Sequence, residues 1–183
     1  LADQPGNIWN RAHLGLVYAT LGRTREAVGA WRRGIRDVQR SRTTHLVNSA
    51  AHAGYAGWLV AQGKPAGRVI ADGLRRFPNN LELQWIRARW LMTRHRWRDA
   101  IGVLEALLQH RGKRGLDRRL PYPAGIFGAD AFEALGTCHF KRREYAAAAR
   151  CYARAYRNAP GKTEFRVKAE LARSMARRRT LTS

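Results

Sequence analysis

The chain has 183 residues, with 35 Lys or Arg against 13 Asp or Glu, and so carries a formal net charge of +22 at pH 7. Its hydrophobic content of 45% is normal for a globular protein and excludes a wholly disordered chain. No apolar run approaches the ~20 residues that a membrane-spanning helix needs. We therefore expect residues 1–183 to form a single folded domain with its own core.

The positive charge, most of it from arginine, allows two interpretations. It predicts attraction to a polyanion such as nucleic acid, anionic lipid or acidic protein. It also has a compositional explanation, because arginine is a good helix former whose stem covers apolar surface. Both interpretations remain open at this level.

The first predicted element is a helical hairpin over about residues 8–41. Its first helix contains Leu14-Gly15-x2-Tyr18, and its second contains Ala27-x3-Trp31-x2-Gly34. Glycine inside a helix costs roughly 1 kcal/mol relative to alanine, so we expect Gly15 to let a neighbouring helix pack close to the backbone. Gly22 and Thr24 mark the turn, and Thr24 is a predicted N-cap of the second helix.

A second hairpin is predicted over about residues 47–80, after a short linker. Gly54 and Ala66 are its small residues, twelve positions apart as in the first hairpin. Pro65 suits the first turn of the second helix, and Pro78 ends that helix because proline cannot continue a helix interior.

A third hairpin is predicted over about residues 81–114, with Ala88 and Ala100 as its small residues. Tryptophan and arginine alternate here, which would allow stacking on bases or sugar rings. At helical spacing, Trp90 and Trp97 are more simply packing residues, and we favour that interpretation. An insertion over roughly 112–128 follows, basic in its first half and apolar in its second. Loops of this length in compact domains are usually functional or disordered. Because the apolar side chains of the second half would prefer a surface to pack on, we expect the insertion to form an ordered flap that lies on the array.

The last hairpin, over about residues 129–162, has the clearest pattern. Leu135-Gly136 is followed by Ala148-x3-Tyr152 and then by Pro160. Residues 163–179 predict one further helix that caps the array. Cys138 and Cys151 lie on the two helices of this hairpin. We expect two buried thiols in a reducing compartment, with a single disulfide as the open alternative.

This combination of small residues, aromatic residues and terminal prolines resembles the tetratricopeptide repeat, a 34-residue helix–turn–helix unit. The resemblance implies an all-α fold: a right-handed superhelical array of antiparallel helix pairs with a C-terminal capping helix. Pro5 precedes Gly15 by ten residues, as Pro78 precedes Ala88. That spacing predicts that the chain is a fragment of a longer protein.

In this family the first helices of the repeats line a concave groove that holds a peptide or a partner helix. The resemblance places the following residues in that groove: Trp9, His13, Leu16, Asn48, His52, Tyr55, Trp58, Trp85, Arg89, Thr137 and Phe140. Aromatic side chains beside Arg, Asn and His suit peptide recognition.

Motifs of catalysis are not found. The sequence contains no phosphate loop, nucleophile elbow, zinc-protease motif or dinucleotide fingerprint, and its six histidines are scattered. We therefore predict a non-catalytic protein with no cofactor and no metal site.

Three functions compete. The leading one is a cytoplasmic scaffold that binds a protein or peptide partner, with homo-oligomerisation left open. A second is an accessory region of a larger bacterial enzyme, because residues 47–162 resemble repeats appended to some bacterial glycosyltransferases. A third is binding of nucleic acid or another polyanion through the following residues: Lys113, Arg114, Arg118, Arg119, Arg177, Arg178 and Arg179.

Overall fold

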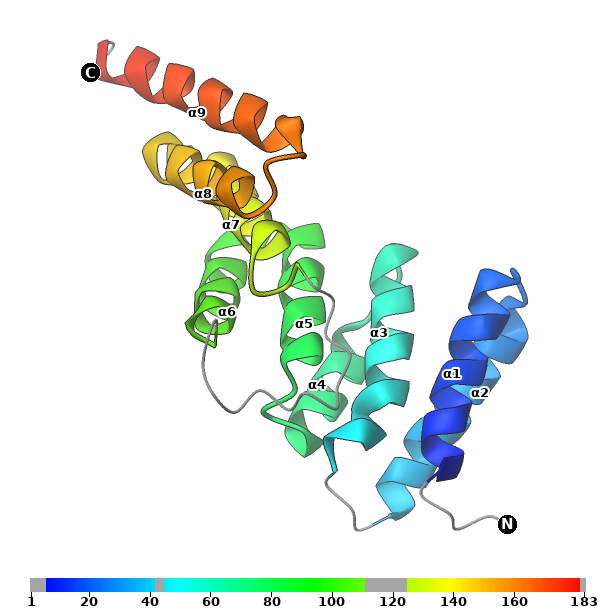
Figure 1. The fold of residues 1–183 in the computed structure, drawn as a ribbon. Helices are drawn as coiled ribbons and strands as arrows, with labels where there is room; N and C mark the ends of the chain where they lie inside the picture. Colours follow the sequence, from blue (N-terminus) through cyan, green and yellow to red (C-terminus); the bar gives the residue numbers. More distant parts are fainter. Residues whose placement is uncertain (1–5, 42–44, 111–124, 182–183) are drawn as a thin grey trace. The chain divides into compact units, whose positions relative to one another are not determined.

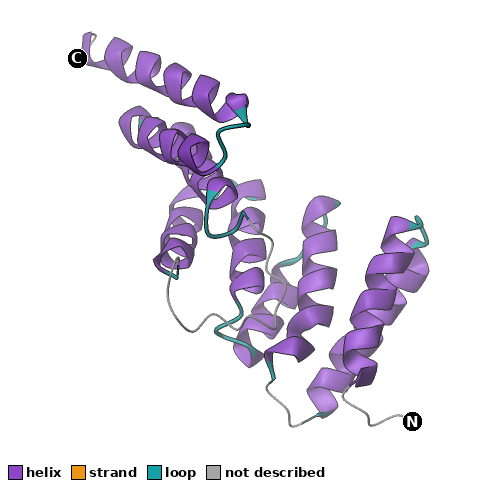
Figure 2. Cartoon of the chain, in the orientation of Figure 1, coloured by secondary structure: helices purple, strands orange, loops and turns teal. Residues whose placement is uncertain are grey.

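The computed structural model describes residues 6–41, 45–110 and 125–181. Within these segments all regular structure is helical, which confirms the predicted all-α class (Figures 1 and 2). The helices are α1 (Gly6–Thr20), α2 (Thr24–Arg40), the 3-10 helix η1 (Leu46–Ser49), α3 (Ala50–Ala61), α4 (Gly67–Arg76), α5 (Leu81–Thr93), α6 (Trp97–Gln109), α7 (Ala129–Lys141), α8 (Tyr145–Asn158) and α9 (Thr163–Leu181). Among the described helices, none has both the length and the apolar character needed to cross a bilayer.

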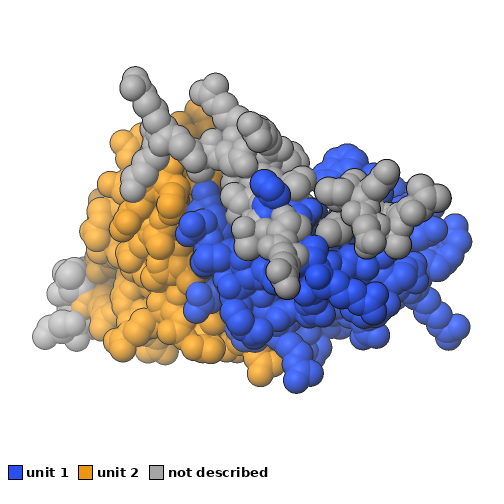
Figure 3. Space-filling view, turned by 90° about the horizontal axis from the view of Figure 1, so that it is seen from below, with its two compact units in different colours: residues 1–90 blue, residues 91–183 orange. Residues whose placement is uncertain are grey.

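The chain forms two compact units, residues 1–90 and residues 91–183 (Figure 3). In the first unit, α1 packs on α2 and α3, and α3 packs on α2 and α4. In the second unit, α7 packs on α6 and α8, and α8 packs on α9. Helices that pack mainly on their neighbours in the sequence are compatible with a helical repeat.

The same turn follows the first helix of all four predicted hairpins. One residue in each turn has a left-handed backbone: Gly22 (φ 71°), Gly63 (φ 64°), His95 (φ 56°) and Arg143 (φ 61°). The N–H of this left-handed residue donates to the carbonyl of the residue three positions earlier. The N–H of the following residue donates to the carbonyl five positions before that following residue. In the first turn these bonds measure 3.2 Å, from Gly22 to Ala19, and 2.8 Å, from Arg23 to Tyr18. This pattern is the Schellman C-cap, so the hairpins share a backbone arrangement as well as a residue pattern.

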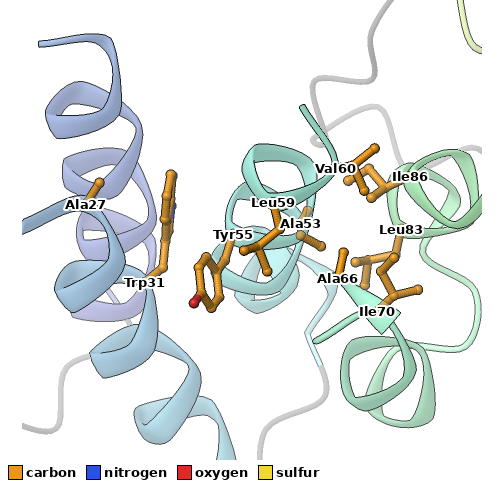
Figure 4. Packing of buried hydrophobic residues seen from close by; sticks show 11 residues of the cluster. Ala27, Trp31, Ala53, Tyr55, Leu59, Val60, Ala66, Ile70, Leu83 and Ile86 are labelled. Atoms are coloured by element: carbon orange, nitrogen blue, oxygen red, sulfur yellow. The ribbon is translucent and has the colours of Figure 1, made fainter. Parts of the chain in front are cut away.

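Trp31 is central to the core of the first unit (Figure 4). Its side chain is fully buried, and its indole N–H donates to the Ala12 carbonyl at 3.2 Å. A Cβ added at Gly15 would collide with the indole, and one added at Gly54 would lie 2.8 Å from Nε1. The predicted close approach at both glycines is therefore confirmed, since both α1 and α3 meet the same ring.

Tyr152 has the corresponding position in the second unit. A Cβ added at Gly136 would lie 2.7 Å from Cδ1 of the Tyr152 ring. Tyr152 belongs to a buried cluster with alanines of α8 and α9, among them Ala169 and Ala172. These two alanines and Phe165 form the buried face of α9.

Two predicted helix starts are wrong. Thr24 is the first residue of α2 rather than its cap, and Arg23 occupies the N-cap position without capping the helix through its side chain. The Arg23 guanidinium instead pairs with Glu26 in the first turn, with Nε 2.7 Å from Oε2. Pro65 precedes α4, which begins two residues later at Gly67.

The predicted flap lies mostly outside the described residues. Its last four residues, 125–128, form a turn that enters α7, with the Gly128 N–H donating to the Gly125 carbonyl at 3.0 Å. Ile126 in this turn is fully buried. Ile126 therefore belongs to the core, and the ordered flap over 112–128 as a whole stays a prediction.

Candidate partner-binding surface

Three of the predicted groove residues lie in the interior of the first unit. Asn48, His52 and Tyr55 are only 2%, 1% and 8% exposed. Tyr55 stacks on Trp31 with ring centroids 5.7 Å apart, and His52 lies edge-on to Phe77 at 6.0 Å. Spacing along a helix predicts which face a residue lies on, but the depth of that face depends on what packs against it.

The other predicted groove residues of the first unit are more accessible. Trp9 is 43% exposed and lies 3.9 Å from the ring of His13. Trp58 is half-buried, with the Lys64 ammonium 4.6 Å from its ring centroid. Trp85 on α5 is half-buried, and Arg89 is exposed.

Thr137 and Phe140 lie on α7 in the second unit, and both are half-buried. The Thr137 hydroxyl lies 3.1 Å from the Tyr152 hydroxyl, which ties α7 to α8. Phe140 meets the Tyr145 ring edge-on at 5.2 Å. Both side chains therefore take part in helix packing, and a role in partner binding stays a prediction.

His52 and Asp72 form a polar cluster in the first unit, at a hollow of about 500 Å³ that Gln39, Arg75 and Arg76 also line. His52 Nε2 lies 3.3 Å from the Asp72 carboxylate, and desolvation by burial lowers the pKa of His52. The same carboxylate accepts hydrogen bonds from Gln39 at 3.2 Å and from Arg75 at 3.0 Å. Because Asp72 joins residues of α2, α3 and α4, we interpret the cluster as a structural link between helices.

The predicted anion-binding residues fall into two groups. Lys113, Arg114, Arg118 and Arg119 lie outside the described residues. Arg177, Arg178 and Arg179 are exposed near the end of α9. Arg179 donates through Nη1 to the Arg143 carbonyl at 2.9 Å, which connects α9 to the α7–α8 turn.

An arginine-walled groove lies along α8 and α9 in the second unit. It has a volume of about 490 Å³ and is lined by Ala146, Ala149, Arg150, Ala153, Arg154, Arg157, Arg173, Ala176 and Arg177. We call this surface the arginine groove. A second hollow of about 610 Å³ shares Ala146, Arg150 and Ala176 with it and reaches Tyr145 at the start of α8.

Helix packing explains why this surface is hollow. Ala148, Tyr152 and Ala155, at positions i, i+4 and i+7 of α8, are buried and face the neighbouring helices. Ala149 at the edge of this face is 6% exposed, and Ala153 beside it is half-buried. Alanine has the shortest of the apolar side chains. Ala149 and Ala153 therefore form the floor of the groove, and the longer arginine side chains extend above them on either side.

The electrostatics of the groove are one-sided. Its described lining contains no carboxylate, and α8 contains three arginines and no acidic residue. Arg150, Arg157 and Arg173 are exposed and form no ion pair or hydrogen bond with the described part of the chain. Their guanidinium groups are therefore available to an anionic ligand.

Four arginines of this groove were not among the predicted site residues: Arg150, Arg154, Arg157 and Arg173. A signal was nevertheless present in the sequence, because arginines at i, i+4 and i+7 share one face of the alanine-rich α8. An alanine-rich helix is more simply interpreted as core, and the adjacent run at 177–179 is the more conspicuous basic feature.

The thiols offer little reactivity. Both cysteines are free rather than joined in a disulfide, but only Cys138 is buried as expected, and Cys151 is half-buried. Burial raises the pKa of the Cys138 thiol to about 12, and burial also raises the pKa of Cys151. No group of three His, Cys, Asp or Glu residues within the described segments could hold a metal ion.

Several exposed apolar residues lie on α1 and in the turn after it. Leu14, Leu16, Val17 and Leu21 are between 46% and 63% exposed. Leu14, Val17 and Leu21 share one face by helical spacing, whereas Leu16 lies on another. Nothing in the described structure shows what covers these residues.

Comparison with protein-family models and with curated proteins gives no match for this chain. The resemblance to tetratricopeptide repeats therefore rests on the chain's own residues.

Proposed function

We propose that the chain is a tetratricopeptide-like helical repeat that binds another protein and carries no chemistry of its own. The four shared turns and the glycine–aromatic contacts at Trp31 and Tyr152 support the repeat. Repeats of this kind stack into scaffolds with extended binding surfaces.

The observation that carries the function is the arginine groove. It combines an apolar floor with exposed guanidinium groups, and arginine is enriched in protein interfaces and among their energetically dominant residues. The chain could also serve as an accessory region of a larger enzyme. The groove would then still bind protein, and its partner would be the catalytic domain of that enzyme.

Nucleic-acid binding is a second candidate, favoured by the absence of carboxylates from the described groove lining. Proteins that bind single strands usually add aromatic rings on which bases stack. The described lining of the arginine groove contains none, so we place this candidate second.

Site-specific photo-crosslinking in native lysate tests the proposal. The photoreactive residue benzoylphenylalanine replaces Ala153 on the groove floor or, as a matched control, Ala106, an exposed alanine of α6. We expect a discrete protein adduct from position 153 that survives nuclease treatment and disappears when Arg150→Gln and Arg173→Gln are added. Equal labelling at both positions would count against the groove, and adducts lost to nuclease would favour nucleic acid.

A further inference from the structure

We infer that the arginine groove binds an acidic amphipathic segment of a partner protein, with carboxylates on its flanks and small apolar side chains between them. This inference rests on the proposed function, that the groove binds protein, and adds the chemistry of the partner.

The arginines form two rows, one on each wall. From Arg150 through Arg154 to Arg157 there are seven residue steps along α8, a rise of about 10.5 Å at 1.5 Å per residue. On α9, Arg173 and Arg177 are one turn apart, a rise of about 6 Å. A helix lying along the groove would present carboxylates at i, i+4 and i+7 with the same rise as the arginines of α8.

Guanidinium groups bind carboxylates and phosphates alike, so the arginines alone do not decide which anion binds. Arginine presents a planar fork of donors that binds a carboxylate through two parallel hydrogen bonds. A single exposed pair contributes little, because the charges are hydrated and the side chains must be held in place. Binding here therefore needs several carboxylates at once, together with a contact that excludes water between them.

The floor supplies that contact. Ala149 is buried, and Ala153 and Ala176 are half-buried between the arginine rows. Alanine side chains offer no donor or acceptor, so a ligand that is polar throughout gains nothing from them. A ligand with apolar side chains between its carboxylates covers the alanines and pairs with both walls, as an amphipathic helix does in a groove.

Fluorescence anisotropy with defined peptides tests the inference on the full 183-residue chain at about 150 mM salt, where long-range attraction is largely screened. The probe is a helical peptide of about 18 residues, long enough to be partly helical, with Glu at i, i+4 and i+7 along one flank, two Glu one turn apart along the other flank, and Ala or Leu on the face between them. A second peptide has Gln in place of each Glu, and a third probe is single-stranded oligothymidine.

Two triple variants separate the groove from general charge. The groove variant carries Arg150→Gln, Arg154→Gln and Arg173→Gln. The control carries Arg32→Gln, Arg36→Gln and Arg40→Gln, three exposed arginines of α2, and loses the same charge. We expect the groove variant to bind the Glu peptide at least about tenfold more weakly, which corresponds to about 1.4 kcal/mol, and the control to differ by less than about threefold. Equal losses in both variants would mean that the attraction is non-specific and would overturn the inference.

The remaining outcomes separate the inference from the proposed function. If the Gln peptide binds as tightly as the Glu peptide and only the groove variant loses it, the acidic chemistry is wrong while the groove remains a protein site. If oligothymidine alone binds through the groove, both proposals are overturned in favour of nucleic acid. If no probe shows groove-dependent binding while far-ultraviolet circular dichroism shows both variants folded, the inference fails and only the lysate crosslinking still bears on the proposed function.

Discussion

One residue in each hairpin turn has a positive φ, and this torsion sets the energetic cost of having a side chain at that position. At Gly22 and Gly63 the left-handed torsion falls on glycine, which adopts it freely. At His95 and Arg143 it falls on residues with a Cβ, for which this conformation costs roughly 1 kcal/mol or more. The turns are therefore alike in hydrogen bonding and unlike in local strain.

The Gly22→Ala substitution tests this directly. No atom lies within 4 Å of a Cβ at Gly22, so the only penalty is the torsion, and we expect the free energy of unfolding to fall by about 1 kcal/mol. Gly102→Ala is the control, since its Cβ is equally unobstructed but lies inside α6. There we expect a gain of up to about 1 kcal/mol in denaturant titrations, because alanine is the better helix former. Equal effects at the two sites would contradict the torsional explanation.

Cys138 should be almost inert in the folded chain. Its pKa of about 12, against an ordinary value of 9.0, leaves on the order of a thousandfold less thiolate at pH 8. We expect maleimide labelling at pH 8 to be slow without denaturant and fast in unfolding concentrations of urea. A Cys151→Ala variant isolates Cys138 for this measurement, and rapid labelling of that folded variant would mean that Cys138 is not buried.

At the scale of elements, helix contacts depend on a few complementary pairs of small and aromatic residues. Gly54→Ala would bring a Cβ to 2.8 Å from the Trp31 indole nitrogen. We expect a loss of about 1 to 3 kcal/mol in the free energy of unfolding, typical of overpacking.

A double-mutant cycle with Trp31→Phe checks the cause of that loss. Phenylalanine lacks the nitrogen-bearing ring that meets the new methyl group, so the two substitutions should couple by at least about 0.5 kcal/mol. The cycle is measured by urea unfolding. If the two losses in the free energy of unfolding are additive, the destabilisation by Gly54→Ala does not come from its contact with Trp31.

These pairs also explain how much of the fold could be predicted from the sequence. Close approach of two helices restricts residue type, so the positions of Gly15, Gly54 and Gly136 in the sequence are enough to predict where the contacts lie. Helix starts were less predictable, because the Arg23–Glu26 ion pair replaces the expected capping by Thr24.

The candidate site was the least predictable part. Residues such as His52 were assigned to a groove from their helical register, but α4 and Phe77 cover that face. The arginine groove depends on which alanines of α8 and α9 face each other and which remain at the surface. Periodicity within one helix does not contain that information. The tetratricopeptide assignment, the continuity of the array across the two units and the cytoplasmic location stay predictions.

At the scale of the whole molecule, the dominant feature is charge. With 35 basic and 13 acidic residues, the chain carries 22 more positive than negative side chains. Their mutual repulsion destabilises any compact state. We interpret the exposed arginine rows as a feature that serves binding, although their repulsion lowers the free energy of unfolding.

Salt should therefore stabilise this protein. Raising NaCl from about 20 mM to about 300 mM shortens the screening length severalfold and weakens repulsion among the excess positive charges. The ion pairs weaken too, but they involve fewer charges, so we expect the melting temperature to rise. A fall in melting temperature on adding salt would mean that the ion pairs outweigh the repulsion.

The shared Schellman turn has a consequence for building chimaeras from this chain. In three hairpins a glycine that contacts an aromatic ring precedes the left-handed residue of the turn. The left-handed residue follows this glycine by seven positions from Gly15 to Gly22 and from Gly136 to Arg143, but by nine positions from Gly54 to Gly63. Two additional residues rotate a helix face by about 200° at 3.6 residues per turn. Exchanging residues 16–23 with residues 137–144 should therefore preserve the phase of the following helix, while a segment transplanted from residues 55–64 would turn its buried face outward.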